Sequence, residues 1–231
     1  MDGIDKLNNL ESEKEYVVID KDEFFREMDL TKAQIQERID FAEETEDLIF
    51  FIYAYIVEMY ERDAVNYDRA KRELVEGYQN IIEEYVPSDK GLRAYTERFA
   101  NEVINTTQRR LNAEISKPDS VLDEVLDNSY WLSDARATET AVNMALDVIN
   151  YKDFVTAKER GFTRKQWLAI EDNRTRPTHS MVNTRIIPID EYFEVGAARL
   201  AFPHDLVTDG STGIDHLEEI ANCRCSFRYV R

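Results

Sequence analysis

Apolar residues recur at steps of three and four positions over much of the first 160 residues, and this spacing predicts amphipathic helices. The clearest stretch runs from Glu46 to Val86 without a proline. Its periodic positions are Leu48, Ile49, Ile52, Ile56, Met59, Tyr60, Ala64, Tyr67, Ala70, Leu74, Tyr78, Ile81, Ile82 and Tyr85. They predict either one long helix or two helices broken near Ala64 or Gly77. This tyrosine-rich stripe is expected to be a packing surface, in the core or against a partner helix.

Helix-capping residues stand where several of these helices should begin. Asp20 has Glu23 three positions on, and Thr31 has Gln34 at the same spacing, as in a capping box. Ser88 follows a proline and is expected to cap a helix that runs to about residue 115.

The pattern changes after Gly161. The last long helix is expected to begin at Ser133 or Asp134 and to end near Arg160, with Gly161 as its terminator. Beyond it, prolines and glycines divide the chain into short pieces. The β-prone segments are 163–170 (a short helix or a strand), 184–189, 192–195 and 225–230. The predicted fold class is α+β, with a mostly helical N-terminal body of long helices and a small C-terminal α+β domain.

The charge of the chain restricts its binding partners. The 231 residues carry a formal net charge of −18, and residues 1–90 alone carry about −14. Because nucleic-acid binding depends on neutralising phosphates, the whole surface does not suit DNA or RNA. The window from Lys158 to Arg176 is basic, and within it Arg160, Arg164 and Lys165 are the candidate DNA contacts.

Neither a membrane span nor a secretory leader is expected. No apolar run approaches the eighteen or so residues that a spanning helix needs, and the N-terminus lacks a basic start followed by an apolar stretch. Cys223 and Cys225 are the only cysteines, and a disulfide between them would close a small, strained ring. A reduced, intracellular setting is therefore expected.

Residues with chemical potential gather between Trp167 and Arg231. Arg174 and Arg176 stand two apart beside Asp172, with His179 across a proline turn. On an extended segment two such arginines would point the same way, and with His179 as acid or base they could bind phosphate. The favoured alternative is that the arginines pair with carboxylates and brace the domain.

The C-x-C pair allows a metal site. Cys223, Cys225 and His179, with His204 or Asp205 as a fourth ligand, have the ligand types of tetrahedral zinc. The alternative is that both thiols are core residues on one side of a strand, with no cofactor.

No catalytic framework is present. The sequence has no glycine-rich phosphate loop, no G-x-S-x-G and no H-E-x-x-H motif. An enzyme remains the alternative to a non-enzymatic protein, as a toxin-like nuclease or nucleotidyl-handling domain using His179 with Arg174 and Arg176, with or without zinc.

An ordered series of motifs runs through the C-terminal part. It consists of A-R-A-T-E-T (135–140, with Arg136 and Glu139), W-x4-D-x-R-T-R-x2-H (Trp167, Asp172, Arg174, Arg176, His179), I-D-E-Y-F (189–193, ending at Phe193), P-H-D (203–205) and N-C-R-C (222–225). This series resembles the phage head morphogenesis domain of the phage Mu protein F-like minor head proteins. It covers roughly residues 130–231, which leaves 1–129 as a helical body with an extended N-terminal lead-in.

The resemblance implies a minor head, or minor capsid, protein without enzymatic activity. Such a protein would associate with the portal protein and with the major capsid or scaffold protein, and packaged DNA is a further candidate partner. It would act in head assembly and in DNA packaging or ejection. It would lie inside the phage head near the portal, and in the host cytoplasm during assembly. The body would contact partners through its apolar, tyrosine-rich faces.

One position departs from the family pattern. After the histidine, members commonly have an Asp-Gly turn, whereas this chain has Met181-Val182-Asn183-Thr184. Asn183 is expected to keep the turn.

Overall fold

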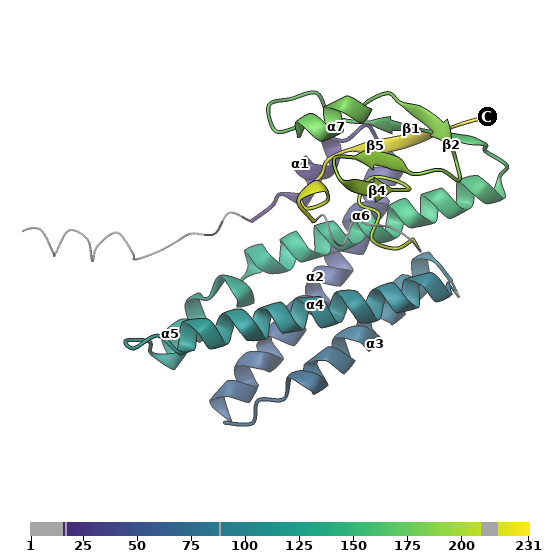
Figure 1. Ribbon diagram of the computed structural model, residues 1–231. Coiled ribbons are helices and arrows are strands. Elements are labelled where there is room, and N and C mark those ends of the chain that lie inside the picture. The colour runs from purple at the N-terminus through teal and green to yellow at the C-terminus, as the bar shows by residue number, and fades with distance from the viewer. Residues whose placement is uncertain (1–15, 17, 88, 209–216) are drawn as a thin grey trace, which may run out of the picture.

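A layer of long helices supports a smaller unit of short strands, and helix α6 lies between the two (Figure 1). The structure, a computed structural model, describes residue 16 and residues 18–87, 89–208 and 217–231. The lead-in predicted for residues 1–20 falls largely outside these residues, as do Ser88 and His216. The fold class is α+β, as predicted.

Four long helices and three short ones make up the described part of the helical body. They are α1 (Lys21–Arg26), α2 (Lys32–Glu61), α3 (Tyr67–Tyr85), α4 (Lys90–Ile115), α5 (Leu122–Asn128), a 3-10 helix (Tyr130–Leu132) and α6 (Asp134–Glu159). The predicted break near Ala64 is confirmed, and Asn66 caps α3 with its side chain. Gly77, the alternative break, lies inside α3. A Cβ there would come within 2.6 Å of Leu48, so glycine lets α2 and α3 approach.

Most of the predicted caps are confirmed. Asp20, Thr31 and Ser133 cap α1, α2 and α6, and Thr31 forms the complete capping box. The cap predicted at Ser88 is wrong, because the N-cap of α4 is Asp89. The Asp89 carboxylate accepts hydrogen bonds of 2.7 and 3.1 Å from two amides of the first turn. A carboxylate also suits the positive end of the helix dipole.

The main core lies among α2, α3, α4 and α6. Ala137, Ala141 and Ala145 of α6 are fully buried, and these small side chains allow close packing against α2. The tyrosine-rich stripe is part of this core, since Tyr53 and Tyr78 are 3 % and 0 % exposed. Its buried tyrosines are therefore not available to a partner, contrary to the expectation that they form a contact face.

Helix α6 belongs to both parts of the molecule. Its apolar face lies in the main core, so the helical body extends past residue 129 to the end of α6. Near its end, Phe154 packs with Phe202 and Phe227 of the C-terminal residues. Gly161, with φ of +73°, terminates the helix as predicted. Residues 162–231 are called the C-terminal unit below.

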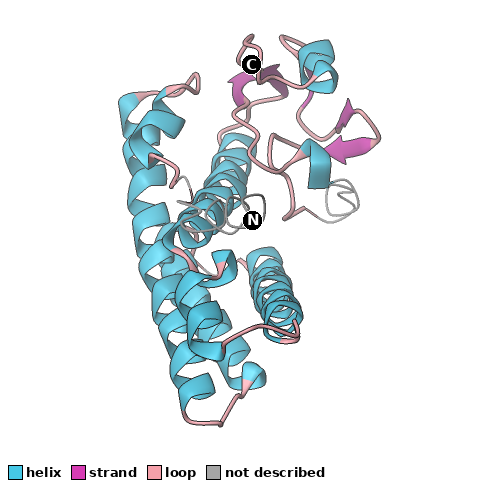
Figure 2. Ribbon diagram, turned by 90° about the vertical axis from the view of Figure 1, so that its left-hand side faces the viewer, coloured by secondary structure: helices cyan, strands magenta, loops and turns pink. Residues whose placement is uncertain are grey.

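Short strands and one short helix form the C-terminal unit. They are β1 (Arg164–Leu168), α7 (Pro177–Val182), β2 (Ile186–Pro188), β3 (Phe193–Val195), β4 (Ala198–Leu200) and β5 (Ser226–Val230). An antiparallel sheet has the order β2-β1-β5, and β3 pairs with β4. Segment 163–170 thus contains a strand, which was one of the two alternatives. Neither α7 nor β4 was predicted. Figure 2 shows the strands gathered on one side of the helical layer.

Within the described residues, no helix is both long and apolar enough to cross a membrane. The turn after α7 is present, but the left-handed residue is Thr184, with φ of +61°, and not Asn183. The Asn183 side chain instead accepts a hydrogen bond from the Ala169 amide at 2.9 Å, which fastens the turn to the end of β1.

Candidate functional site

Four charged side chains join the end of α1 to the C-terminal unit. Arg224 donates to both oxygens of the Asp172 carboxylate, at 2.7 and 2.8 Å, and to Glu27 at 2.8 Å. Glu27 also accepts contacts of 2.6 Å from Arg174. The hydrogen bonds from Arg224 lower the pKa of Asp172 to about 2. These residues, Glu27, Asp172, Arg174 and Arg224, are called the charged seam below.

Arg174 and Arg176 do not form the predicted paired anion site. The segment is a turn and not an extended strand, so the two side chains diverge. Arg174 faces Glu27, whereas Arg176 donates to the carbonyl of Ala221 at 2.5 Å. The bracing alternative therefore fits both arginines, although only Arg174 braces through a carboxylate.

Glu139 connects α6 to the N-C-R-C segment. Its carboxylate accepts hydrogen bonds from the Tyr130 hydroxyl at 2.6 Å, from Arg136 at 3.0 Å and from the Asn222 amide at 3.3 Å. Burial raises the pKa of Glu139, but these hydrogen bonds lower it overall. Arg136 also lies over the Trp131 ring. The first and last blocks of the motif series are thus in direct contact.

His179, Cys223 and Cys225 form a buried cluster. His179 lies on α7, and the two cysteines directly precede β5. The His179 Nδ1 atom is 3.3 Å from the Cys225 sulfur and 3.4 Å from the Cys223 sulfur. All three side chains are 2–3 % exposed, and both cysteines are free thiols. The three residues predicted as metal ligands therefore lie within reach of a single ion.

The other ring nitrogen of His179 faces a carboxylate. Nε2 is 3.2 Å from Glu219, and the Thr178 hydroxyl donates to the same carboxylate at 2.7 Å. Burial lowers the pKa of His179, but the hydrogen bond to Cys223 raises it overall. Burial raises the pKa of Cys223, whereas the hydrogen bond from Cys223 lowers that of Cys225.

Aromatic side chains enclose the cluster on the sheet side. Trp167 of β1 is fully buried and packs edge-on against His179, with ring centroids 5.7 Å apart. Phe193 also packs edge-on against Trp167, with ring centroids 5.2 Å apart. These two predicted residues exclude water from the polar groups beside them.

The predicted fourth metal ligands, His204 and Asp205, point elsewhere. Asp205 accepts hydrogen bonds from three backbone amides and from the Thr208 hydroxyl within its own loop. His204 Nε2 lies 3.0 Å from the carbonyl of Cys223 and must donate to it, because a carbonyl only accepts. Neither side chain faces the sulfurs, so the prediction that one of them completes the site is wrong.

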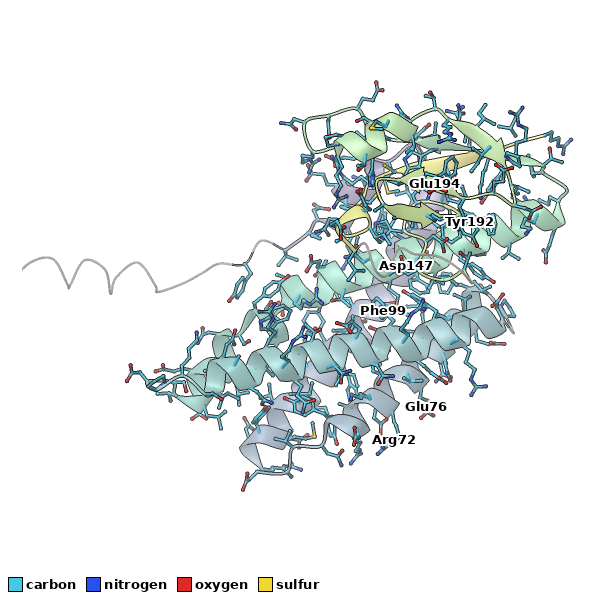
Figure 3. All side chains as sticks on the ribbon, viewed as in Figure 1. Arg72, Glu76, Phe99, Asp147, Tyr192 and Glu194 are labelled. Atoms are coloured by element: carbon cyan, nitrogen blue, oxygen red, sulfur yellow. The ribbon has the colours of Figure 1, made fainter. Side chains whose placement is uncertain are left out.

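A chain of buried polar side chains runs from α4 to the segment that contains Cys223. The Tyr95 hydroxyl donates to Asp147 at 2.8 Å, and Asp147 lies 3.5 Å from His204 Nδ1. Figure 3 labels Asp147 on α6, where the helical body meets the C-terminal unit. Burial raises the pKa of Asp147. Through His204, this chain holds the backbone of Cys223 against the body.

The predicted DNA contacts are only partly on the surface. Arg160 and Arg164 are exposed, but Lys165 is fully buried. The Lys165 ammonium donates to the Ile189 carbonyl at 2.8 Å and lies 4.9 Å from the centre of the Phe154 ring. The prediction that Lys165 contacts DNA is therefore wrong, because β1 directs it into the core.

A cavity of about 20 Å³ adjoins the sulfurs and is lined by Arg174, Arg176 and the His179–Cys223–Cys225 cluster. That volume holds one water molecule or one ion.

Sequence reasoning did not single out several residues that complete the site. Arg224 stands inside the N-C-R-C motif, and its position between the two cysteines was a usable signal. Glu27, Glu219 and Asp147 carried none, since each is one acidic residue among many in an acidic chain.

Comparison of the chain with models of known protein families, with curated proteins and with solved structures finds no match.

Proposed function

We propose that this chain is a non-enzymatic minor head protein of a phage, which associates with the portal and acts in head assembly and in DNA packaging or ejection. The proposal rests on the ordered motif series in residues 135–225. It is supported by one observation, that blocks far apart in the sequence contact each other. Glu139 meets Asn222, Asp172 meets Arg224, and the ring of His179 meets both cysteines.

The contacts suit a scaffold better than a catalytic site. Arg174 and Asp172 are engaged in the ion pairs of the charged seam. His179 is only 2 % exposed, so its ring has little access to a substrate in solution. Residues of the series thus position the C-terminal unit on the helical body. A unit fixed to the body by such contacts presents its surface to a partner without rearrangement, which reduces the entropy cost of binding.

The test is co-expression with the cognate portal and shell proteins. The proposal expects the chain to co-purify with the portal and to be found in assembled heads, and its absence from both would refute it. Cleavage of DNA or RNA that is lost in His179→Ala would favour the enzyme instead.

Two variants locate the contact once incorporation is seen. Phe51 of α2 and Met181 of α7 are large apolar residues, 63 % and 83 % exposed. Loss of incorporation for Phe51→Asp alone assigns the contact to the helical body, and loss for Met181→Asp alone assigns it to the C-terminal unit. Each substitution faces solvent, so folding is expected to be retained.

A further inference from the structure

The His179–Cys223–Cys225 cluster already has the dimensions of a metal centre. In a tetrahedral zinc site, with Zn–S near 2.3 Å and Zn–N near 2.0–2.1 Å, nitrogen and sulfur ligands stand about 3.5 Å apart. The two distances from His179 Nδ1 to the sulfurs are 3.3 and 3.4 Å, and all three ligand atoms lie within 4.8 Å of one another. An ion can therefore bind with little movement of the side chains.

Glu219 orients the histidine for that role. Its carboxylate lies 3.2 Å from Nε2, within ion-pair distance but without hydrogen-bond geometry, and the described residues offer Nε2 no hydrogen-bond partner. A proton on Nε2 leaves the lone pair of Nδ1 directed at the two sulfurs. A carboxylate behind a histidine is the usual outer partner of metal-bound imidazole. Gly196 secures this arrangement, because a Cβ there would come within 2.2 Å of the Glu219 carboxylate.

The surroundings of the sulfurs favour negative charge. The backbone amide of Cys225 donates a hydrogen bond to the Cys223 sulfur at 3.4 Å. Arg176 and Arg224 line the adjoining cavity. Amide-to-sulfur hydrogen bonds and nearby cations stabilise thiolates, which are the form that binds metal. Two thiols that only filled a core would need none of these groups.

The cavity supplies the remaining position. Its volume of about 20 Å³ holds one water molecule, next to the three ligand atoms. The ligand types determine which metal is preferred. Thiolate is a soft ligand, so two thiolates and one imidazole prefer zinc to magnesium or calcium.

We infer that His179, Cys223 and Cys225 bind a zinc-class divalent ion, with water as the fourth ligand and Glu219 as a positioning residue. The ion joins α7 to the segment before β5. That segment also carries Arg224 into the charged seam, so the metal stabilises the attachment of the C-terminal unit to the body. This inference does not depend on the proposed function.

The first experiment uses the full-length wild-type protein. Metal is removed by chelation under reducing conditions, and Zn²⁺ or Co²⁺ is added back alone. We expect one equivalent to bind, a higher Tm with Zn²⁺, and the absorption bands of tetrahedral, thiolate-bound cobalt. Absence of these bands with both thiols reduced would overturn the inference.

Variants then assign the ligands. Cys223→Ser and Cys225→Ser should each abolish the sulfur-to-cobalt bands, and Glu219→Gln should weaken Zn²⁺ binding about 10–100-fold while keeping the bands. Met181→Ser is the control, because this sulfur-bearing residue of α7 is 83 % exposed and does not belong to the cluster. Unchanged binding by a Cys223→Ser, Cys225→Ser double variant would refute the assignment. Should a serine variant fail to fold, the wild-type cobalt spectrum decides alone.

Discussion

The helical body and the C-terminal unit are held together by different means. In the body, residues such as Ile52, Ile56 and Leu74 recur at helical spacing and fill one apolar core. In the C-terminal unit the strands are three to five residues long, and buried polar side chains such as Lys165 and His179 occupy central places. The stability of the body should therefore be most sensitive to substitutions that remove apolar volume. The stability of the C-terminal unit should be most sensitive to substitutions that remove a hydrogen-bond or ion-pair partner.

The largest expected effect tests the packing of the body. Ile52→Ala truncates a side chain of α2 that is only 1 % exposed and lies in the main core. The substitution should lower the unfolding free energy by about 2–5 kcal/mol. Phe51→Ala, one position earlier and 63 % exposed, should change it by less than about 0.5 kcal/mol. Urea denaturation followed by far-UV circular dichroism measures both. Equal effects would mean that α2 does not pack as described.

The charged seam gives the next largest effect. Arg224→Met leaves the carboxylates of Glu27 and Asp172 without a nearly buried guanidinium, and should cost about 1.5–3 kcal/mol. Arg224→Lys should restore little, since an ammonium cannot make the bidentate contact with Asp172.

Arg228 provides the control for the seam. It pairs with Asp29 at 3.4 Å, but its side chain is 59 % exposed, so Arg228→Met should cost less than about 1 kcal/mol. Both variants are measured by denaturation monitored through tryptophan fluorescence. A similar loss in the two would show that burial of Arg224 adds nothing.

The same contrast explains what the sequence could predict. Helical periodicity and caps are local, so α2, α3 and α6 follow from residues a few positions apart, and only the cap at Ser88 was misplaced. The register of α4 survived that error, because the apolar positions of a helix determine which side it buries.

The C-terminal unit depends on contacts with no local signature. Glu27 and Arg224 stand 197 positions apart, and Glu219 and His179 stand 40 positions apart. The C-x-C spacing of the two cysteines, together with the ligand types of all three residues, predicted that His179, Cys223 and Cys225 could meet. The prediction failed for Lys165, which was expected on the surface because it lies in a basic window. Side chains of β1 alternate between the two faces of the strand, and Lys165 points to the buried face.

Lys165 also predicts a dependence of stability on pH. Burial lowers its pKa from 10.5 to about 8. Between these values the unfolded chain holds more protons than the folded one, so this residue makes stability rise with pH across that interval. The difference in unfolding free energy between wild type and Lys165→Met should grow by about 1 kcal/mol per pH unit from pH 8 to 10.

Urea midpoints at several pH values measure that difference. Taking it between two proteins removes the contribution of the tyrosines that both share. Arg164→Met, one residue earlier on β1 and exposed, is the control, and its difference from wild type should stay constant. A constant difference for Lys165→Met as well would mean that its ammonium is not buried in the folded protein.

The smallest expected effect concerns the junction of the two parts. Gly161 has φ of +73°, and a Cβ there would meet no atom within 4 Å. Gly161→Ala should therefore cost only the backbone strain of a left-handed residue, about 1 kcal/mol, and Gly161→Asn should cost less. Differential scanning calorimetry measures both. Because neither variant removes a contact of the body or of the C-terminal unit, the molecule should still unfold in one transition. A second transition would show that the glycine couples the two parts and does more than end α6.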